Sequence, residues 1–174
     1  MVSFIDIENA LYAWATGVVG STIPVIWYHQ NAPRPNAPYV ALHLFTQRSV
    51  GVDAQLAPGD QGENEIVGNR DFTLECQGVG KGSGDICELL KSSLQFLEVQ
   101  EQLRAAGIAV VDWLAVQDLS ELVDSRWEER NVVDFIFRFA QVSTATPGLI
   151  EHLNGEATYK SVDNVTITIN TIQV

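Results

Sequence analysis

Two apolar stretches separated by a proline-rich loop stand out in the pattern of hydrophobic and polar positions. Residues 25–28 and residues 39–45 have the composition of strands, and both alternating sets of side chains in the second are largely apolar. Pro33, Arg34 and Pro35 lie between them. Because proline fixes φ and has no N–H for a sheet, we expect a stiff loop that holds Arg34 outward. We predict a central hairpin whose Pro-Arg-Pro tip is presented to another protein; the alternative is a rigid surface loop without a partner.

Helical spacing of apolar residues marks the N-terminal segment. Between residues 4 and 18, apolar side chains recur on one face of a helix. Ser3 followed by Asp6 resembles a capping box, and Gly20 is a natural stop. The pattern predicts an amphipathic helix that covers one face of the sheet.

A second helical region occupies the middle of the chain. Asp85 is placed to cap a helix with an apolar stripe over residues 86–97, and a further helical set, residues 99–106, ends at Gly107. The glycine-rich run before it, residues 78–84, lies where a phosphate-binding loop would lie. It lacks the glycine and the Ser or Thr that this motif requires, so we interpret it as a flexible turn.

Alternation of apolar and polar residues predicts three more strands, at residues 69–77, 108–116 and 127–142. The segment at residues 117–125 is predicted to be a short irregular or single-turn element. In the last strand four side chains should face the core: Val133, Phe135, Phe137 and Phe139.

Residues 51–68 form the weakest segment for order, and we predict a long mobile hairpin arm there. The segment has little apolar material, no base and four acids: Asp53, Asp60, Glu63 and Glu65. Loops of this length usually have a function or are disordered. We expect an acidic arm that becomes ordered on assembly; the alternative is a solvated surface loop.

The C-terminal residues have a β pattern of their own. Asn154-Gly155 is a strong turn signal and predicts a hairpin over residues 150–159. After a turn at residues 163–164, a final strand alternates, with one apolar face formed by Val165, Ile167 and Ile169. A lone hairpin is marginal in water, so these strands either fold back on the chain's own domain or add to another chain's sheet.

These elements predict an α+β fold. We expect a mixed, mostly antiparallel sheet of about four to five strands with helices packed on one face, and a C-terminal β-hairpin or strand extension. The expected parts are residues 1–146 and residues 147–174.

Composition and charge narrow the range of functions. The chain has 174 residues, 46 % of them hydrophobic, and a formal net charge of −12. An acidic chain repels the nucleic-acid backbone, so we do not expect a protein that grips DNA. A protein surface that DNA must slide past without binding would, however, benefit from a negative charge. The sequence shows no basic leader and no long apolar run, so we expect neither secretion nor membrane spanning. We interpret Cys76 and Cys87 as reduced thiols in the core.

We recognise no catalytic or metal-binding motif. His29, His43 and His152 fall on different predicted strands without metal-ligand spacing. Glu128 and Glu129 are adjacent in a strand, so their side chains diverge. We predict no enzyme activity, no cofactor and no metal; carboxylates brought together across strands are the one alternative.

Four short motifs occur in a telling order: Gln-Asn-Ala-Pro-Arg-Pro at residues 30–35, Pro-Tyr-Val at 38–40, Val-Gln-Asp-Leu at 116–119 and Asp-Ser-Arg-Trp-Glu-Glu-Arg at 124–130. In this order, over roughly residues 1–142, the chain resembles the tail (neck) terminator proteins of tailed bacteriophages. The resemblance implies a structural virion protein of the neck, assembled in the bacterial host cytoplasm. It would form a homohexameric ring on the last ring of the tail tube, end tube growth and dock the head-side connector.

The implied partners are further copies of the chain, the tail tube protein and the head-completion or connector protein, with the tail sheath protein as a further candidate. DNA would pass through the lumen without specific binding, and the acidic arm would face the lumen or the tube. The rival hypothesis is a soluble, non-catalytic binding module with an open β edge.

The strand that begins near residue 126 is the candidate subunit contact. Alternation directs Trp127 and Glu129 to one face and Glu128 and Arg130 to the other, so one pair should contact a neighbouring subunit. The alternative is a tryptophan that belongs to the core, with solvated charges beside it. The full predicted interface is Pro33, Arg34, Pro35, Arg126, Trp127, Glu128, Glu129 and Arg130.

Overall fold

The structure is a computed structural model that describes residues 3–57, 59, 63–123, 125–145, 157–160 and 166–169. The chain divides into two compact units, Met1–Ala54 with Val67–Val142 and Gln55–Ile66 with Ser143–Val174. The helices are α1 (Phe4–Val19), α2 (Ser83–Ser93) and α3 (Leu97–Ala105). Among the described residues, no helix is long and apolar enough to cross a bilayer.

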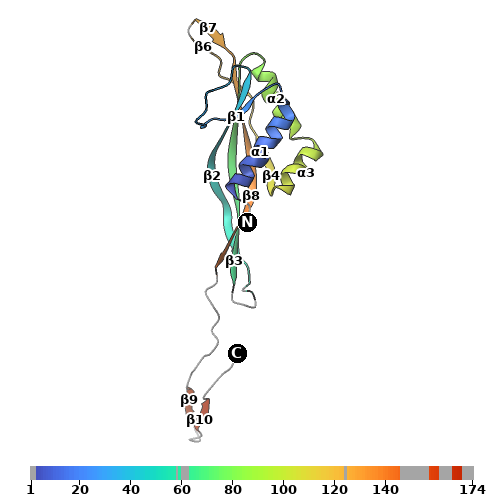
Figure 1. Cartoon of the computed structure of the whole chain (residues 1–174). Helices are drawn as coiled ribbons and strands as arrows, with labels where there is room; N and C mark the ends of the chain where they lie inside the picture. Colours follow the sequence, from blue (N-terminus) through green and yellow to red (C-terminus); the bar gives the residue numbers. More distant parts are fainter. Residues whose placement is uncertain are drawn as a thin grey trace. The chain divides into compact units, whose positions relative to one another are not determined.

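A six-stranded sheet has the order β1-β2-β3-β8-β4, and β5 also pairs with β8 (Figure 1). Its strands are β1 (Val25–Trp27), β2 (Tyr39–Gln55), β3 (Asn64–Val79), β4 (Ile108–Trp113), β5 (Gln117–Asp118) and β8 (Arg130–Ala145). β1 runs parallel to β2, whereas β4 and β5 run antiparallel to β8. The predicted α+β fold with a mixed, mostly antiparallel sheet is therefore confirmed, with six strands in place of four to five.

The first two strands do not form the predicted hairpin. β1 pairs with β2 in parallel, with Val25 beside Val40 and Trp27 beside Leu42, and it lies at the edge of the sheet. The loop over residues 28–38 is long enough to carry the chain back to the end where β1 starts, as a parallel pair requires. β2 lies between β1 and β3, so its predicted interior position is correct.

α1 begins and ends where the sequence predicts. The Asp6 N–H donates to Ser3 Oγ (3.1 Å), and the Ser3 N–H donates to Asp6 Oδ2 (3.2 Å), which closes the capping box. Gly20 ends the helix at φ +77°. α2 differs from the prediction, since Gly82 and not Asp85 occupies its N-cap position.

The hydrophobic core lies between the sheet and the three helices, which Figure 1 shows on one face. Trp14 of α1 packs edge-to-face against Phe135 and Phe137, with ring centroids 5.5 and 6.1 Å apart. Its indole Nε1–H donates to Ser93 Oγ at 3.0 Å. The four core positions predicted in β8 are all buried, which confirms that assignment.

Strand pairing extends further than the sequence indicates. β2 continues to Gln55 and β3 begins at Asn64, so the segment predicted as a mobile arm is largely strand. The segment predicted as irregular, residues 117–125, contributes β5 and one strand of a separate two-stranded sheet. That small sheet consists of β6 (Glu121–Val123) and β7 (Arg126–Glu128), so the predicted strand over residues 127–142 is interrupted at Glu129.

The second unit contains an antiparallel pair of strands, β9 (Ala157–Lys160) and β10 (Thr166–Ile169). Tyr159 lies beside Ile167 in this pair. The predicted final strand is present over these four residues. The turn predicted at Asn154-Gly155 and His152 lie outside the described residues.

Candidate functional site

The β6–β7 hairpin, at the top of the view in Figure 1, carries two exposed apolar side chains. Leu122 and Trp127 are opposite each other across the two strands, and cross-strand partners share a face. Trp127 is 74 % exposed and Leu122 is 60 % exposed. The alternative that Trp127 belongs to the core is therefore wrong. We call this pair of residues the apolar tip.

Arg130 holds the hairpin against the main sheet. Its guanidinium forms ion pairs with Glu121 (3.3 Å) and Glu128 (3.7 Å), one residue from each strand of the hairpin. Its backbone N–H donates to Ser120 Oγ at 3.1 Å. Glu128 and Arg130 thus lie on one side, as alternation predicts, but their charges are used within the chain.

Glu129 also acts within the chain, through the glycine-rich loop. Its carboxylate accepts a hydrogen bond from the Gly82 N–H (2.8 Å), and its carbonyl oxygen accepts one from the Gly80 N–H (2.8 Å). An anion at this position is favoured by the positive end of the α2 dipole. Gly80 has φ +94°, and a Cβ added there would lie 2.6 Å from Ala37 Cβ. The loop is therefore closely packed rather than a flexible turn, and its anion is the protein's own carboxylate.

The proline-rich loop is exposed at Pro33 and Arg34 and half-buried at Pro35. The Arg34 guanidinium carbon lies 5.8 Å from the centre of the Tyr28 ring, within the range of a cation–π interaction. This contact holds Arg34 over the residue that follows β1.

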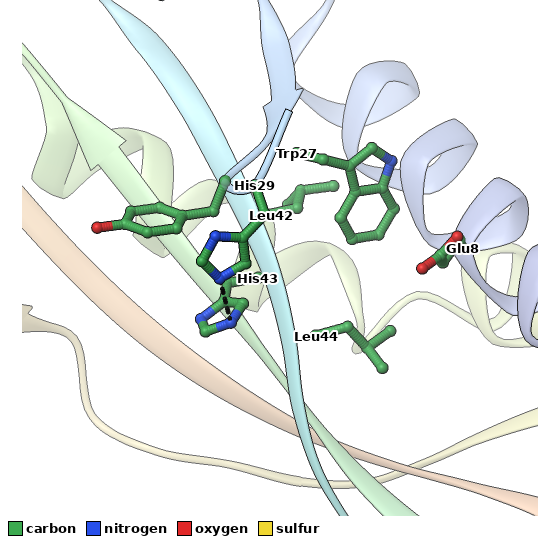
Figure 2. Close-up of a pocket in the computed structure, with 7 residues that line it drawn as sticks. Glu8, Trp27, His29, Leu42, His43 and Leu44 are labelled. Atoms are coloured by element: carbon green, nitrogen blue, oxygen red, sulfur yellow. Dashed lines mark hydrogen bonds between the residues drawn. The ribbon is translucent and has the colours of Figure 1, made fainter. Parts of the chain in front are cut away.

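A cleft opens beside this loop, between α1 and the point where β1 ends (Figure 2). It has a volume of about 180 Å³ and is lined by Glu8, Trp27, Tyr28, His29, Leu42, His43 and Leu44. Figure 2 shows the two histidines on one side of the open space and Trp27, Glu8 and Leu44 on the other. We call these seven residues the aromatic cleft.

The two histidines of the cleft contact each other, which the sequence did not indicate. Their Nε2 atoms are 3.2 Å apart, and the Tyr28 ring stacks on His43 with centroids 5.4 Å apart. A hydrogen bond between two imidazoles requires that one nitrogen be an unprotonated acceptor. Within the described ranges, no group of three or more His, Cys, Asp or Glu residues is arranged to hold a metal ion.

The sheet face opposite the helices carries an ion pair between a buried aspartate and a half-buried arginine. The Asp71 side chain is 4 % exposed and accepts two hydrogen bonds from Arg138, at 2.6 and 3.0 Å. Arg48 lies 3.5 Å from the same carboxylate. The hydrogen bonds from Arg138 lower the pKa of Asp71.

Two further carboxylates on this face, Glu75 and Asp134, have raised pKa values, in contrast to the lowered pKa of Asp71. Burial raises the pKa of Asp134, and one of its oxygens is buried with no hydrogen-bond partner among the described residues. Burial, and then the charge of Asp134, raise the pKa of Glu75 on the neighbouring strand β3. Carboxylates are thus brought near each other across strands, the arrangement that sequence could not exclude.

Replacing these aspartates with asparagine should change stability in opposite directions. Asp71 contributes stability above its unfolded pKa of about 3.9, and this is lost as the pH falls through its lower folded pKa. Asp71→Asn should therefore destabilise the fold at pH 7, by about 1–2 kcal/mol. Asp134 is penalised as the pH rises through its raised folded pKa, so Asp134→Asn should raise Tm at pH 7 and lose that advantage near pH 3.

Thermal melts at the two pH values measure both effects. Each substitution removes one negative charge from a chain of net charge −12, so the general relief of repulsion is matched between them. Equal shifts of the same sign at pH 7 would show that net charge, and not the local contacts, governs the response.

The predicted acidic arm is only partly a set of free charges. Arg70 donates to Asp53 (2.7 Å) and to Gln141 Oε1 (2.9 Å), and its hydrogen bonds lower the pKa of Asp53. Glu63 and Glu65 belong to the second unit, and Asp60 lies outside the described residues. Asp53 therefore ties the β2–β3 hairpin together.

A model of the family described as phage neck terminator protein matches residues 6–172. The chain belongs to this family. The match includes the C-terminal segment, which the motif resemblance did not cover. A search of curated proteins found no significant match. A phage neck terminator is a structural component of the virion, located in its tail, where it contacts other tail and head proteins. As a member of the family, the present chain has this role.

In this neck terminator, the predicted interface residues of the segment 126–130 fall into two groups. Glu128, Glu129 and Arg130 are engaged within the chain, whereas Arg126 and Trp127 remain exposed. Sequence reasoning missed Leu122, Glu8 and the histidine pair. The turn residues between the apolar segment at 122–123 and the strand at 126–128 could have indicated the β6–β7 hairpin, but no local signal links Glu8 to the histidines.

Proposed function

We propose that this neck terminator forms a homohexameric ring at the head-proximal end of the tail tube. The ring ends tube polymerisation and provides the docking face for the head-side connector. The observation that supports it best is the exposed apolar tip, on a hairpin that the ion pairs of Arg130 join to β8, in a domain with a hydrophobic core of its own. A large exposed aromatic beside a second exposed apolar side chain is typical of a protein–protein contact.

The charge of the chain suits a ring through which DNA passes. Six copies, each with a net charge of −12, give a lumen wall that does not retain DNA. In this proposal the acidic arm, with the carboxylates of Glu63 and Glu65, faces the lumen or the tube; Asp60, the fourth acid of the predicted arm, lies outside the described residues. Asp53 serves the hairpin instead, through Arg70.

The partners in this proposal are further copies of the chain, the tail tube protein and the head-completion or connector protein, with the sheath protein as a further candidate. No membrane is involved, and assembly takes place in the host cytoplasm. In this proposal the C-terminal strands reach a neighbouring protein. Of the predicted strand-addition residues, Ile167 and Ile169 belong to β10, and Val165 lies outside the described residues.

Electron microscopy of tails assembled with and without this chain tests the proposal. Without it, tubes should be of irregular length and should not join heads; with it, each tube should end in a ring. The ring, released from tubes or free, should have a mass near six times 19.1 kDa. Tails of normal length that join heads in the absence of the chain would refute the proposed function.

A binding module with an open β edge is the second candidate, because one edge of the sheet supports it. β1 pairs only with residues 40–42, so beyond Leu42 no described strand covers the outer edge of β2. An exposed edge can bind an extended peptide as an added strand. If the chain remains a monomer when it is mixed with tail tubes and binds a peptide at this edge, the binding module is the better explanation.

A further inference from the structure

We propose that the aromatic cleft of each subunit receives the apolar tip of the next copy of the chain, an inference that rests on the proposed ring. Trp127 of one subunit occupies the cleft of its neighbour, and Arg126 meets Glu8 at the rim. The two halves of the predicted interface are then opposite sides of one contact: residues 126–127 supply the inserted side, and the loop at residues 33–35 lies beside the receiving side.

The apolar tip is built to be inserted. Leu122 and Trp127 are exposed together on one face of a hairpin with only three residues in each strand. Such a short hairpin is marginal in water by itself. The ion pairs of Arg130 with Glu121 and Glu128 join both of its strands to β8, so the hairpin backbone that carries Trp127 is already in place before binding.

The cleft matches one large side chain. Its volume of about 180 Å³ is below the roughly 300–1,000 Å³ of small-molecule sites. Aromatic rings line it, including the stacked Tyr28 and His43, and indoles pack well against such rings. Glu8 supplies the one carboxylate of the lining, and a buried tryptophan N–H needs an acceptor of this kind.

The charges at the two surfaces are complementary. Bases are scarce in this chain, with 10 against 22 acids, yet the exposed Arg126 precedes Trp127 in β7. Its side chain leaves the opposite face of the hairpin, so it can meet a partner at the rim of the cleft and not inside it. Among the described residues Arg126 forms no ion pair, whereas Glu8 stands at the cleft. Two acidic copies would repel each other over most of their surfaces, so a local pair of opposite sign favours this orientation of approach.

The backbone around the cleft is also open. The cleft lies where β1 ends, and from His43 onward no described strand pairs with the outer edge of β2. The β6–β7 pair is a separate sheet, and no described strand pairs with its outer edges. A neighbouring hairpin that inserts Trp127 can therefore add main-chain hydrogen bonds at this edge.

The tip and the cleft are different surfaces of the same chain. A contact between them is head-to-tail, and head-to-tail contacts close into rings when the rotation between copies allows it. No second kind of subunit contact is then needed for a cyclic assembly.

The test uses three variants of the full chain, each added to purified tail tubes and also examined free by native mass spectrometry. Trp127→Ala removes the tip, and Glu8→Arg blocks the cleft by repelling Arg126. Asn9→Arg is the matched control, because it adds an arginine to the next, exposed position of α1, outside the cleft. We expect rings from the wild type and from Asn9→Arg, and at least tenfold fewer from each of the other two.

Mixing the two defective variants gives the sharper result. The Glu8→Arg chain keeps an intact tip and the Trp127→Ala chain keeps an intact cleft, so one contact can form between them and the ring cannot close. We expect complexes of two chains from the mixture and single chains from each variant alone. The double variant Glu8→Arg with Arg126→Glu should recover part of the rings, because it restores the pair of opposite charges but not the acceptor for the indole N–H.

Other outcomes separate this inference from the proposed function. Wild-type rings together with normal rings from Glu8→Arg would overturn the inference and leave the ring proposal standing. Normal rings from Trp127→Ala that fail to join heads or tubes would assign the tip to another protein. If the wild type forms no ring, either free or on tubes, both proposals fail.

Discussion

A Trp127→Ala chain should fold as stably as the wild type and should fail to form rings. The side chain is 74 % exposed, so its removal should change the free energy of unfolding by no more than about 0.5 kcal/mol. Tryptophans at the centre of interfaces typically cost about 2 kcal/mol or more when truncated, which is roughly a thirtyfold loss of affinity. Because the loss recurs at every contact of a ring, closure should be abolished at concentrations that assemble the wild type.

A buried tryptophan of the same chain provides the matched control. Trp14 is 5 % exposed, packs on Phe135 and Phe137 and donates to Ser93, so Trp14→Ala should cost about 3–5 kcal/mol of stability. Thermal melts and native mass spectrometry of both variants separate folding from assembly. Trp127→Phe should retain part of the assembly. Rings from Trp127→Ala at wild-type concentration would refute the assignment.

The sequence predicts α1 and the buried face of β8 well because both depend on local periodicity. It is wrong about the stripe over residues 86–97, since α2 ends at Ser93 and Leu89 and Leu97 are exposed. The capping box at Ser3 and Asp6 needs only four consecutive residues, and it forms as predicted. The alternation of Phe135, Phe137 and Phe139 within one strand identifies its buried face without knowledge of its neighbours. Such features are encoded within a few residues of one another.

Strand direction is not encoded in this way. The pattern of β1 and β2 is the same for a parallel and an antiparallel pair, and the path of the loop at residues 28–38 decides between them. The prediction of an unpaired acidic arm also failed because the deciding residue lies outside the segment. Within residues 51–68 no base is present, but Arg70 lies just beyond and pairs with Asp53.

The candidate site combines predictable and unpredictable parts. Trp127 stands out because an exposed strand beside charged residues is a plausible contact, but its partner Leu122 comes from a strand of three residues, too short to show alternation. The aromatic cleft assembles Glu8 of α1 with His29 and His43, and only the parallel register of β1 and β2 brings the two histidines together. No spacing in the sequence reports that register.

Deleting residues 148–174 should abolish assembly and leave the core intact. Every residue of the main hydrophobic cluster belongs to Met1–Ala54 or Val67–Val142, so the deletion removes none of its members. The shortened chain should therefore melt cooperatively near the wild-type Tm. The two four-residue strands β9 and β10 are too few for an independently stable sheet, which is why we propose that they add to a neighbouring protein.

A point substitution distinguishes strand addition from a mere requirement for length. Ile167→Pro removes a backbone N–H from the middle of β10 and should block addition of this strand, whereas Ile167→Val keeps the N–H and a β-branched side chain. We expect ring formation on tubes, scored by electron microscopy, to be lost with proline and retained with valine. Calorimetry of the same two chains should give the same Tm for the main transition. If the deletion or the proline instead unfolds the core, these strands belong to the chain's own domain, because a segment that acts only between proteins cannot lower the stability of the free chain.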